Sequence, residues 1–408
     1  MNKQNKKPGR ILCVTSTLPR WSGDAIPHFV LHLAQDLQDL GWQVDILAPY
    51  ASGAAHREIL QGISIFRFPY FWPSHSQTLC YQSGALINIR ENKSNLLKIP
   101  FFLVAEYLAI VKKLRQKHYD LIHCHWVIPQ GFTGILASMP LKVPQITTIH
   151  GSDIHSLNST FFNQFKAFTL KHSKAVTVNS SSTRQACTDV YKNHPQLHKI
   201  PMGISLPVLD QGKIKNIRQK FTQNEVSPLI IFAGRLIAEK GVGDLINAIN
   251  LLSDHLPDIK LLILGSGKKQ EYYQGLSKRH ALVEKISFVG WLDPEVLPLY
   301  LAAADIFVAP SWKEAQGLSI IEAMAAKTAV IATSVGGIPD IVQHEKTGLL
   351  IAEKSPQQIM AAILRLTKDT TLRKKLIRQG YELVNNHYSR KQTAQKFSQL
   401  FQEISATA

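Results

Sequence analysis

The chain has 408 residues, of which 45% are hydrophobic and 18% are charged. This composition excludes a disordered chain, and the length predicts two globular domains of roughly 200 residues each. The formal net charge of +17 fits either a solvated basic surface or a polyanionic partner, namely nucleic acid, an anionic membrane surface or a phosphorylated small molecule.

The cysteines and the apolar segments indicate the compartment. The polar N-terminus, up to Arg10, is not a signal peptide, and the longest apolar run, Ile99–Val111, contains Glu106 and is too short to cross a bilayer. The cysteines are far apart without metal-type spacing, which favours a reducing compartment. We therefore expect a cytoplasmic protein, with peripheral attachment to the inner face of a membrane as an alternative. The four cysteines are Cys13, Cys80, Cys124 and Cys187.

Short apolar runs alternate with helical patterns in the first half of the chain. Arg10–Thr15 predicts a buried strand, Ile26–Leu40 a helix that Gly41 ends, and Gln43–Ala48 a second strand. This unit predicts a right-handed parallel crossover. Further strands are predicted at 63–68, 121–124, 145–149 and 175–178, and helices at 100–116, 161–172 and 181–190.

A polar stretch, Asp210–Lys220, leads into a second series of the same kind. Asp293 followed by Pro294 predicts one helix start, with the aspartate as N-cap. The alternation predicts the α/β class, with two doubly wound parallel-sheet domains facing a cleft and ligands beyond the carboxyl ends of the strands. Strands are predicted at 229–232, 260–264, 286–288, 306–308 and 329–332, and helices at 242–253, 318–326, 356–366, 372–384 and 391–404.

The segment Gly234–Gly241 directly follows a predicted strand. Gly234 lets the backbone approach a ligand, Arg235 offers a planar fork for phosphate oxygens, and Lys240 adds a mobile charge. The N-terminus of the next helix contributes partial positive charge. Together these features suit a diphosphate, whereas the alternative is a surface loop with two solvated cations.

Two glutamates follow another predicted strand. Glu314 lies on a loop after Pro310, and Glu322 lies one turn into the next helix. Carboxylates at these positions can accept hydrogen bonds from vicinal hydroxyls of a sugar and of a ribose. The free amides near Gly317 can meet phosphate oxygens. The alternative for either glutamate alone is a solvated helix face.

At these residues the sequence resembles the retaining glycosyltransferases of family 4, which have the two-Rossmann GT-B fold. The family's Glu-x7-Glu motif matches Glu314 and Glu322, and its G-R-L-x-x-E-K-G segment matches Gly234–Gly241. The similarity covers essentially the whole second half and is looser in the first. Further typical segments are 300–305, 321–325, 335–340 and 347–350, together with 120–126 and 149–153 in the first half.

The sequence departs from the family pattern at two places. The turn Pro19–Asp24 contains a single glycine, which weakens the expectation of backbone contact with donor phosphates there. Ala315 and Gln316 replace the glycine and phenylalanine most common after the first glutamate. Because Gln316 can still hydrogen-bond a sugar hydroxyl, we expect this change to tune the donor.

The resemblance implies transfer of a sugar from a nucleotide diphosphate sugar with retention at the anomeric carbon, and it implies no metal or other cofactor. In the family's favoured mechanism, the leaving phosphate accepts the proton of the acceptor. Arg235 and Lys240 are then expected to stabilise the leaving diphosphate. Glu314 and His150 are expected at the donor sugar, and Glu322 at the ribose. Further substrate contacts are expected from Gln316, Gly317, Leu318, Gly234, Gly265, Gly267, Asp153 and His125.

The consecutive residues His123, Cys124 and His125 do not predict a metal site. On a strand the two histidines share one face and the cysteine lies on the other, so three such ligands rarely meet at one ion. His125 and Trp126 are more plausible on the acceptor side of the cleft.

Within the GT-B architecture we expect residues 1–205, joined by a C-terminal helix at 389–408, to carry the acceptor site. Residues 206–388 are expected to carry the donor site. The expected acceptor is a glycan or lipid-linked glycan of cell-surface polysaccharide or glycolipid biosynthesis.

Other functions were weighed against this one. A sugar phosphorylase using inorganic phosphate fits the same scaffold. A non-catalytic nucleic-acid-binding protein is the third alternative, but no basic segment with interleaved aromatics supports a nucleic-acid partner. A dehydrogenase is disfavoured because no G-x-G-x-x-G follows the first strand.

The segment Leu96–Lys117 joins a strongly apolar stretch to a basic end. One interpretation is an amphipathic element that rests on an anionic leaflet, helped by the N-terminal lysines. The alternative is a core-packing helix whose last turn carries cations favourable to its dipole. The apolar residues include Phe101, Phe102, Leu103 and Tyr107, and the cations are Lys112, Lys113, Arg115 and Lys117 together with Lys3, Lys6 and Lys7.

Overall fold

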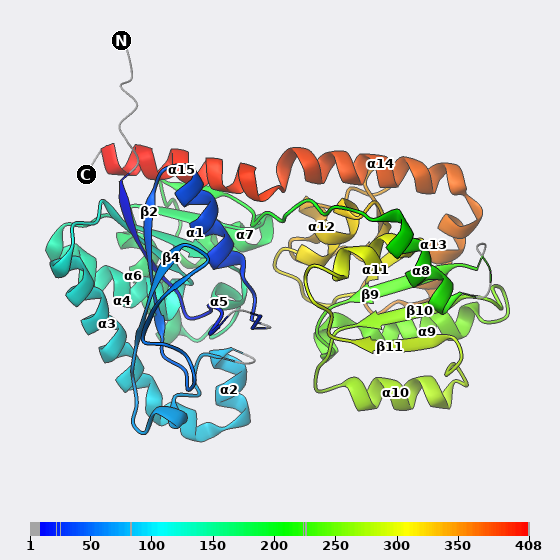
Figure 1. Cartoon of the computed structure of the whole chain (residues 1–408), viewed down its shortest axis with the longest axis horizontal. Coiled ribbons are helices and arrows are strands. Elements are labelled where there is room, and N and C mark those ends of the chain that lie inside the picture. The colour runs from blue at the N-terminus through cyan, green and yellow to red at the C-terminus, as the bar shows by residue number, and fades with distance from the viewer. Residues whose placement is uncertain are drawn as a thin grey trace, which may run out of the picture. The chain divides into compact units, whose positions relative to one another are not determined.

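The protein is described here by a computed structural model that covers residues 9–406, except 22, 25, 82–83, 223 and 225–226. The chain forms two compact units, one of residues 1–202 with 390–408 and one of residues 203–389. The sequence-based bounds, 205/206 and 388/389, lie close to these. Each unit is an α/β structure around its own sheet, which confirms the predicted fold class (Figure 1).

The sheet of the first unit has the order β3-β4-β2-β1-β5-β6-β7-β8, and its neighbouring strands are parallel except for β3 and β4. Its central strands β1, β5 and β6 are buried along almost their whole length because helices cover both faces. From β1 the chain winds in one direction through β2 and later in the other direction through β5, so the winding reverses between β1 and β5. The strands are β1 (Arg10–Val14), β2 (Gln43–Pro49), β3 (Arg57–Leu60), β4 (Ile63–Phe68), β5 (Leu121–His125), β6 (Gln145–Ile149), β7 (Ala175–Val178) and β8 (Leu197–Lys199).

Helices pack on the two faces of this first sheet. The C-terminal helix α15 lies beside α1 (Figure 1), where Arg390 pairs with Asp36 at 2.6 Å and Trp42 Nε1 donates to Ser398 Oγ at 2.9 Å. The helices are α1 (Phe29–Asp39), α2 (Ala85–Glu91), α3 (Ile99–Gln116), α4 (Phe132–Ser138), α5 (Ser152–His155), α6 (Thr160–His172), α7 (Ser181–Val190) and α15 (Arg390–Ala406). Shorter helical turns are η1 (Ser74–Ser76), η2 (Lys93–Lys98), η3 (Val127–Gly131) and η4 (Met139–Leu141).

The sheet of the second unit has the order β11-β10-β9-β12-β13-β14, and all its neighbouring strands are parallel. Its core lies in two layers, with α9 and α13 on one face and α11, α12 and α14 on the other. The strands are β9 (Leu229–Ala233), β10 (Lys260–Leu264), β11 (Ile286–Gly290), β12 (Ile306–Ala309), β13 (Ala329–Thr333) and β14 (Leu349–Ile351). The helices are α8 (Gln211–Phe221), α9 (Val242–Leu252), α10 (Gln270–Arg279), α11 (Leu297–Ala303), α12 (Leu318–Ala325), α13 (Pro356–Lys368) and α14 (Thr370–His387), with turns η5 (Ala238–Lys240) and η6 (Ile338–Asp340).

Several sequence-based expectations differ from the structure. The polar stretch Asp210–Lys220 is helix α8, whose start is capped by the Asp210 side chain. The Asp293 cap is present, because its Oδ1 accepts from Glu295 N at 2.8 Å and its carbonyl accepts from Leu297 N at 2.9 Å, but residues 294–296 form a turn and α11 begins only at Leu297. The first sheet is not wholly parallel, because β3 is an antiparallel edge strand. The N-terminal lysines Lys3, Lys6 and Lys7 lie outside the described residues.

Candidate active site

The donor-side residues of the second unit gather where the winding of its sheet reverses. From β9 the chain goes through β10 and β11 on one side, and β12, β13 and β14 follow on the other side. In such sheets the crevice beyond the carboxyl ends of the two central strands is the usual ligand site. The loop after β9 carries Gly234, Arg235 and Lys240, and the loop after β12 carries Glu314 and Gly317.

The loop after β12 is held from both sides. Its Trp312 amide donates to Glu239 O at 2.8 Å, and Trp312 Nε1 donates to Asp244 Oδ2 at 2.7 Å. On the other side, Gly337 N donates to Glu314 O at 3.1 Å, and a Cβ at Gly336 would overlap that same carbonyl oxygen. These contacts fix the backbone of Glu314. Trp312 and Asp244 carry no recognisable sequence signal, because their contact joins residues far apart in the chain.

An ion pair joins the two loops directly. Lys240 Nζ lies 2.5 Å from Glu314 Oε2, and both side chains are mostly buried. Arg235 lies in the same loop as Lys240 and is exposed. The structure therefore brings one predicted cation, Lys240, and one predicted carboxylate, Glu314, together at the carboxyl edge of the sheet.

Glu322 lies one turn into α12 and is partly buried. Burial raises the pKa of Glu322 to about 7. Among the described residues, no side-chain hydrogen bond or ion pair satisfies this carboxyl group. No described side chain caps the N-terminus of α12 at Gly317, whose φ is 96°. A partly buried acid with a raised pKa and a helix N-terminus that no described side chain caps thus occur on the same short helix.

The remaining predicted residues of the second unit pack tightly. A Cβ at Gly265 would overlap Gly234 O, and Leu236 N donates to Ser266 O at 2.9 Å, so the loops after β9 and β10 are in backbone contact. The glycines at these positions are therefore required for packing, whether or not a nucleotide contacts them. Gly267 is required for the same reason, Gln316 is buried at the start of α12, and Leu318 is partly buried there.

In the first unit, aromatic side chains at the carboxyl ends of β5 and β6 contact one another. The His125 and His150 rings stack at 5.2 Å, with Nδ1 of His125 2.9 Å from Nε2 of His150. Phe29 and Trp126 contact this pair. Burial lowers the pKa of His150 to about 3 and that of His125 well below its usual value, so both imidazoles are neutral near pH 7.

Asp153 fixes the loop that carries Trp126. Its Oδ2 accepts from Val127 N at 2.7 Å, and its Oδ1 accepts from Gly151 N at 3.0 Å and from His150 N at 3.2 Å. Trp126 itself has a left-handed φ of 78°, a conformation that this side chain seldom adopts. Because both carboxylate oxygens accept from the backbone, Asp153 positions the loop, and its substrate contact stays a prediction.

The consecutive residues His123, Cys124 and His125 point as predicted. Cys124 packs among the apolar residues on one side of the sheet, and the two histidine rings lie 4.4 Å apart on the other. Cys13, whose position in the sequence shows no metal-type spacing, lies beside His123 across β1 and β5. The sequence alone does not reveal this contact, because 109 residues lie between Cys13 and His123.

Comparisons with known proteins agree with this architecture. The sequence model of a family described as "Glycosyl transferases group 1" matches residues 213–383, and that of "Glycosyltransferase Family 4" matches residues 27–207. A glycosyltransferase assigned to teichuronic acid biosynthesis in Bacillus subtilis strain 168 is 26% identical over 419 residues, which cover 98% of this chain and 100% of that protein.

Two solved structures share the fold. Sucrose-phosphate synthase from Thermosynechococcus elongatus has a TM-score of 0.78 at 24% identity and covers 98% of this chain and 100% of its own. Anabaena HepE, solved in complex with UDP, has a TM-score of 0.74 at 17% identity and covers 97% and 100% respectively.

The two parallel-sheet units and these neighbours define the GT-B class of glycosyltransferases. The two family models together cover most of both units. This chain belongs to the group 1 glycosyltransferases, a family related to enzymes of polysaccharide and glycolipid biosynthesis.

The buried carboxyl of Glu322 predicts a pH-dependent effect on stability. Its folded-state pKa, about 7, lies above the usual 4.5, so this group favours the folded state at low pH and loses that contribution as the pH rises through 7. Glu322→Gln should therefore raise the Tm at pH 8 and change it little at pH 5, measured by differential scanning calorimetry.

Glu345 provides the opposite control. Its pKa is lowered by the hydrogen bond and charge of Arg365, so Glu345→Gln should not raise the Tm at pH 8. An equal Tm shift for Glu322→Gln at both pH values would show that its carboxyl does not carry a burial penalty.

Proposed function

We propose that this enzyme transfers a sugar from a nucleotide diphosphate sugar to an acceptor glycan or lipid-linked glycan, with retention at the anomeric carbon. The observation that carries the proposal is the Lys240–Glu314 ion pair, which joins the loops after β9 and β12 at the point where the second sheet reverses its winding. Arg235 is exposed in the loop after β9. A cation and a carboxylate at the carboxyl ends of the strands suit a nucleotide sugar, whose diphosphate is anionic and whose sugar carries hydroxyl groups.

The leaving diphosphate is the main electrostatic demand of this reaction. Arg235 and Lys240 supply two positive charges, and the uncapped N-terminus of α12 supplies backbone amides. In the ligand-free enzyme Lys240 is neutralised by Glu314. When the donor binds, Lys240 turns to the phosphate and Glu314 accepts hydrogen bonds from the sugar hydroxyls.

Glu322 suits the ribose for an energetic reason. A carboxyl group that is buried without a partner gains when vicinal hydroxyls donate to it, and that gain favours its charged form. Donor binding below pH 7 should therefore release a proton from Glu322. Support for a uridine nucleotide is limited to the fold shared with HepE, which was solved with UDP.

The acceptor hydroxyl attacks the anomeric carbon on the face that the phosphate leaves. The bond from this carbon to the phosphate oxygen breaks, and the leaving phosphate takes the acceptor's proton. His150 stays neutral because of its low pKa, so it contributes a hydrogen bond rather than a positive charge. The relative assigned to teichuronic acid biosynthesis supports a cell-surface polymer as the product.

Helix α3 supports peripheral attachment to a membrane. By length and composition alone, Lys93–Gln116 is apolar enough to cross a bilayer. Its inner face, however, packs in the first unit through Phe102, Glu106 and Ile110, with Glu106 bonded to Gln130 and Thr133. Its outer face is an exposed apolar row at helical spacing. This row is Leu97, Phe101, Val104 and Leu108.

The basic end of α3 is only partly free. Lys113 lies over the Phe66 ring, where burial lowers its pKa to about 8, and Lys117 pairs with Asp45. Lys112 and Arg115 remain exposed next to the apolar row. An apolar row with adjacent cations fits the interface of an anionic leaflet. A lipid-linked acceptor would then meet the enzyme at the membrane surface.

The first prediction concerns the leaving group. Arg235→Ala and Lys240→Ala should each lower kcat by ~10-fold or more, because a preorganised charge at developing negative charge commonly contributes ~3 kcal/mol. The assay is release of nucleoside diphosphate from a panel of nucleotide sugars, with inorganic phosphate and a sugar donor as the test for a phosphorylase. Lys368→Ala, on the exposed end of α13, is the matched control. Near-normal kcat in both active-site variants would refute the assignment.

The second prediction separates the two glutamates. Glu322→Gln should weaken binding of the free nucleoside diphosphate, since its proposed partner is ribose. Glu314→Gln should retain that binding but lose sugar transfer. Isothermal titration calorimetry with the nucleoside diphosphate measures both. Equal loss of affinity in the two variants would contradict separate roles.

The third prediction concerns the membrane. The protein should sediment with vesicles that contain anionic lipid, less so at high salt and not with neutral vesicles. Phe101→Asp and Leu108→Asp should abolish sedimentation without unfolding the chain, because both side chains are exposed. Val208→Asp, at an exposed apolar residue of the second unit, is the control. Absence of binding by the folded wild-type protein would indicate a soluble acceptor.

A further inference from the structure

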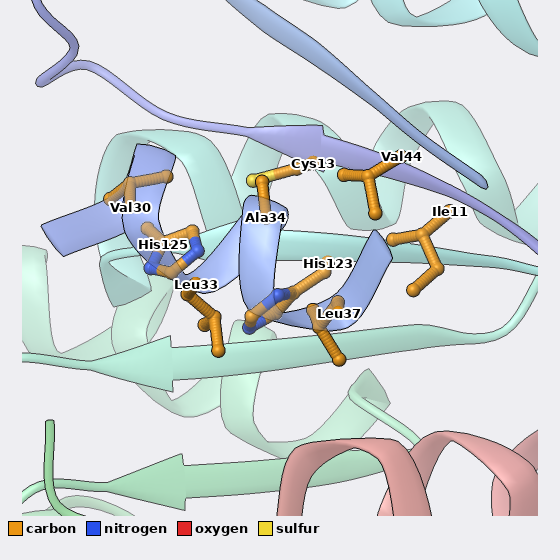
Figure 2. Close-up of a pocket in the computed structure, with 9 residues that line it drawn as sticks. All are labelled: Ile11, Cys13, Val30, Leu33, Ala34, Leu37, Val44, His123 and His125. Carbon is orange, nitrogen blue, oxygen red and sulfur yellow. The ribbon is translucent and has the colours of Figure 1, made fainter. Parts of the chain in front are cut away.

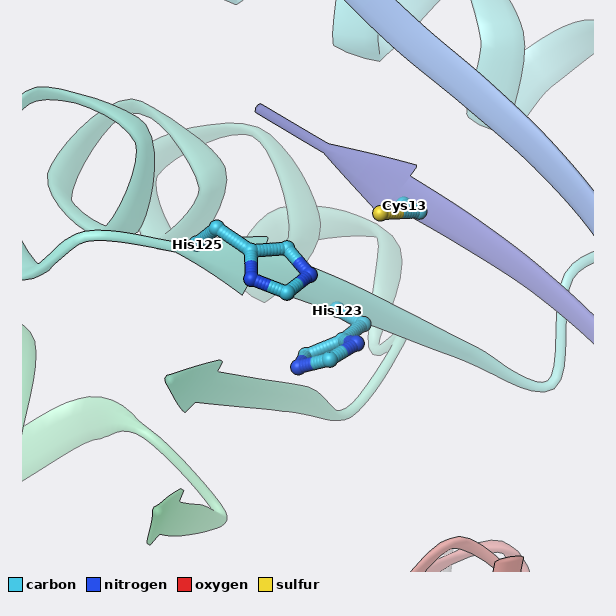
Figure 3. A group of neighbouring side chains, drawn as sticks. All are labelled: Cys13, His123 and His125. Atoms are coloured by element: carbon cyan, nitrogen blue, oxygen red, sulfur yellow. The ribbon is translucent and has the colours of Figure 1, made fainter. Parts of the chain in front are cut away.

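Three potential metal ligands converge inside the first unit, and one of them, His125, stacks on His150. The parallel register places Cys13 of β1 directly beside His123 of β5, and His125 lies two residues further along the same face. The sulfur and one ring nitrogen of each histidine lie within 4.8 Å of one another (Figure 3). All three residues are buried.

One nitrogen of each imidazole ring takes part in a hydrogen bond. His123 Nε2 lies 2.6 Å from Thr148 Oγ1, and His125 Nδ1 lies 2.9 Å from His150 Nε2. Histidines that bind metals are typically held in this way through their second ring nitrogen. The other nitrogen of His125, Nε2, is buried and has no hydrogen-bond partner among the described residues. Such an unpaired nitrogen is costly unless it meets a ligand.

A small cavity of about 10 Å³ lies between these side chains and helix α1 (Figure 2). Its remaining lining is aliphatic. A single water fits this volume but needs two to four polar partners, and only the three ligand residues offer any. The aliphatic lining consists of Ile11, Val30, Leu33, Ala34, Leu37 and Val44.

We propose that Cys13, His123 and His125 form a site for one soft monovalent metal ion of the Cu(I) class. Thiolate and imidazole are ligands that Cu(I) accepts readily. Charge decides between ions: one thiolate and two neutral imidazoles balance a single positive charge. A divalent ion would leave a net charge in an aliphatic cavity, at a high desolvation cost.

The binding step balances without any oxidant or reductant. Burial raises the pKa of the Cys13 thiol and lowers that of His123 to about 3, so the ligand-free site holds a thiol and neutral imidazoles. On binding, the S–H bond breaks, the sulfur–metal bond forms and one proton leaves to solvent. Two imidazole lone pairs complete the coordination, and the oxidation state of the ion is unchanged.

The ion has a structural consequence for the first unit. It joins β1 to the end of β5, immediately before Trp126, the residue with the left-handed φ. It therefore stabilises the start of the loop that follows β5, whose Val127 amide donates to Asp153. This role does not depend on the identity of the donor or acceptor.

The test is an anaerobic titration of the purified full chain with Cu(I), buffered by a competing chromophoric chelator. Wild-type protein should bind one equivalent and gain thermal stability, and Zn(II) should bind more weakly. Cys13→Ala should weaken Cu(I) binding more than ~100-fold, beyond the ~10–100-fold that loss of an outer hydrogen-bond partner costs. Cys187→Ala removes an equally buried thiol elsewhere in the unit and should retain binding.

X-ray absorption of the loaded wild-type protein keeps the proposal testable if Cys13→Ala fails to fold. The expected coordination is one sulfur and two nitrogens. Two or more sulfurs, unchanged binding in Cys13→Ala, or tighter binding of Zn(II) than Cu(I) would each overturn the site. Absence of stoichiometric binding by the folded wild-type protein would do the same, and the cavity would then hold only water.

Discussion

The pairing of β9 with both β10 and β12 is the interaction on which the second unit depends. Parallel strands require helical crossovers, and crossovers of one hand place helices on opposite faces once the winding reverses. The loops after β9 and β12 then leave the sheet on either side of the reversal, and the Lys240–Glu314 ion pair joins them. The winding of the first sheet reverses in the same way between β1 and β5. In both units, the ionisable side chains of the candidate site therefore lie beside the central pair of strands.

The side chains beside the central strand pairs are charged in the second unit and neutral in the first. In the second unit, Lys240 and Glu314 form an ion pair and Glu322 has a raised pKa. A polar substrate can break this ion pair and change the charge of Glu322. In the first unit, burial keeps the histidines uncharged and packs them with Phe29 and Trp126. A neutral, rigid layer suits recognition by shape and hydrogen bonding, whereas the charged loops suit a substrate that changes its charge during reaction.

Local sequence patterns predicted most of the fold because many central strands, such as β9, β10 and β12, are apolar runs between turn residues. They failed where the signal was short or polar: β8 and β14 have three residues each, and α8 has no buried residue to mark its face. The cationic and acidic site residues were visible because they follow strands. Cys13 beside His123, and the Asp153 contacts with Val127, depend on strand register and loop packing, which one sequence does not contain.

The return of the chain to the first unit through α15 makes the second unit an insertion. Its first and last residues meet: Ile204 N donates to Tyr388 O at 2.9 Å, and Ile204 also bridges Ser389. A segment whose ends are tied together can be excised or exchanged between related proteins without opening either core. In evolutionary terms, residues 203–389 have the form of an interchangeable cassette, so specificity at one sheet can diversify while the other is conserved.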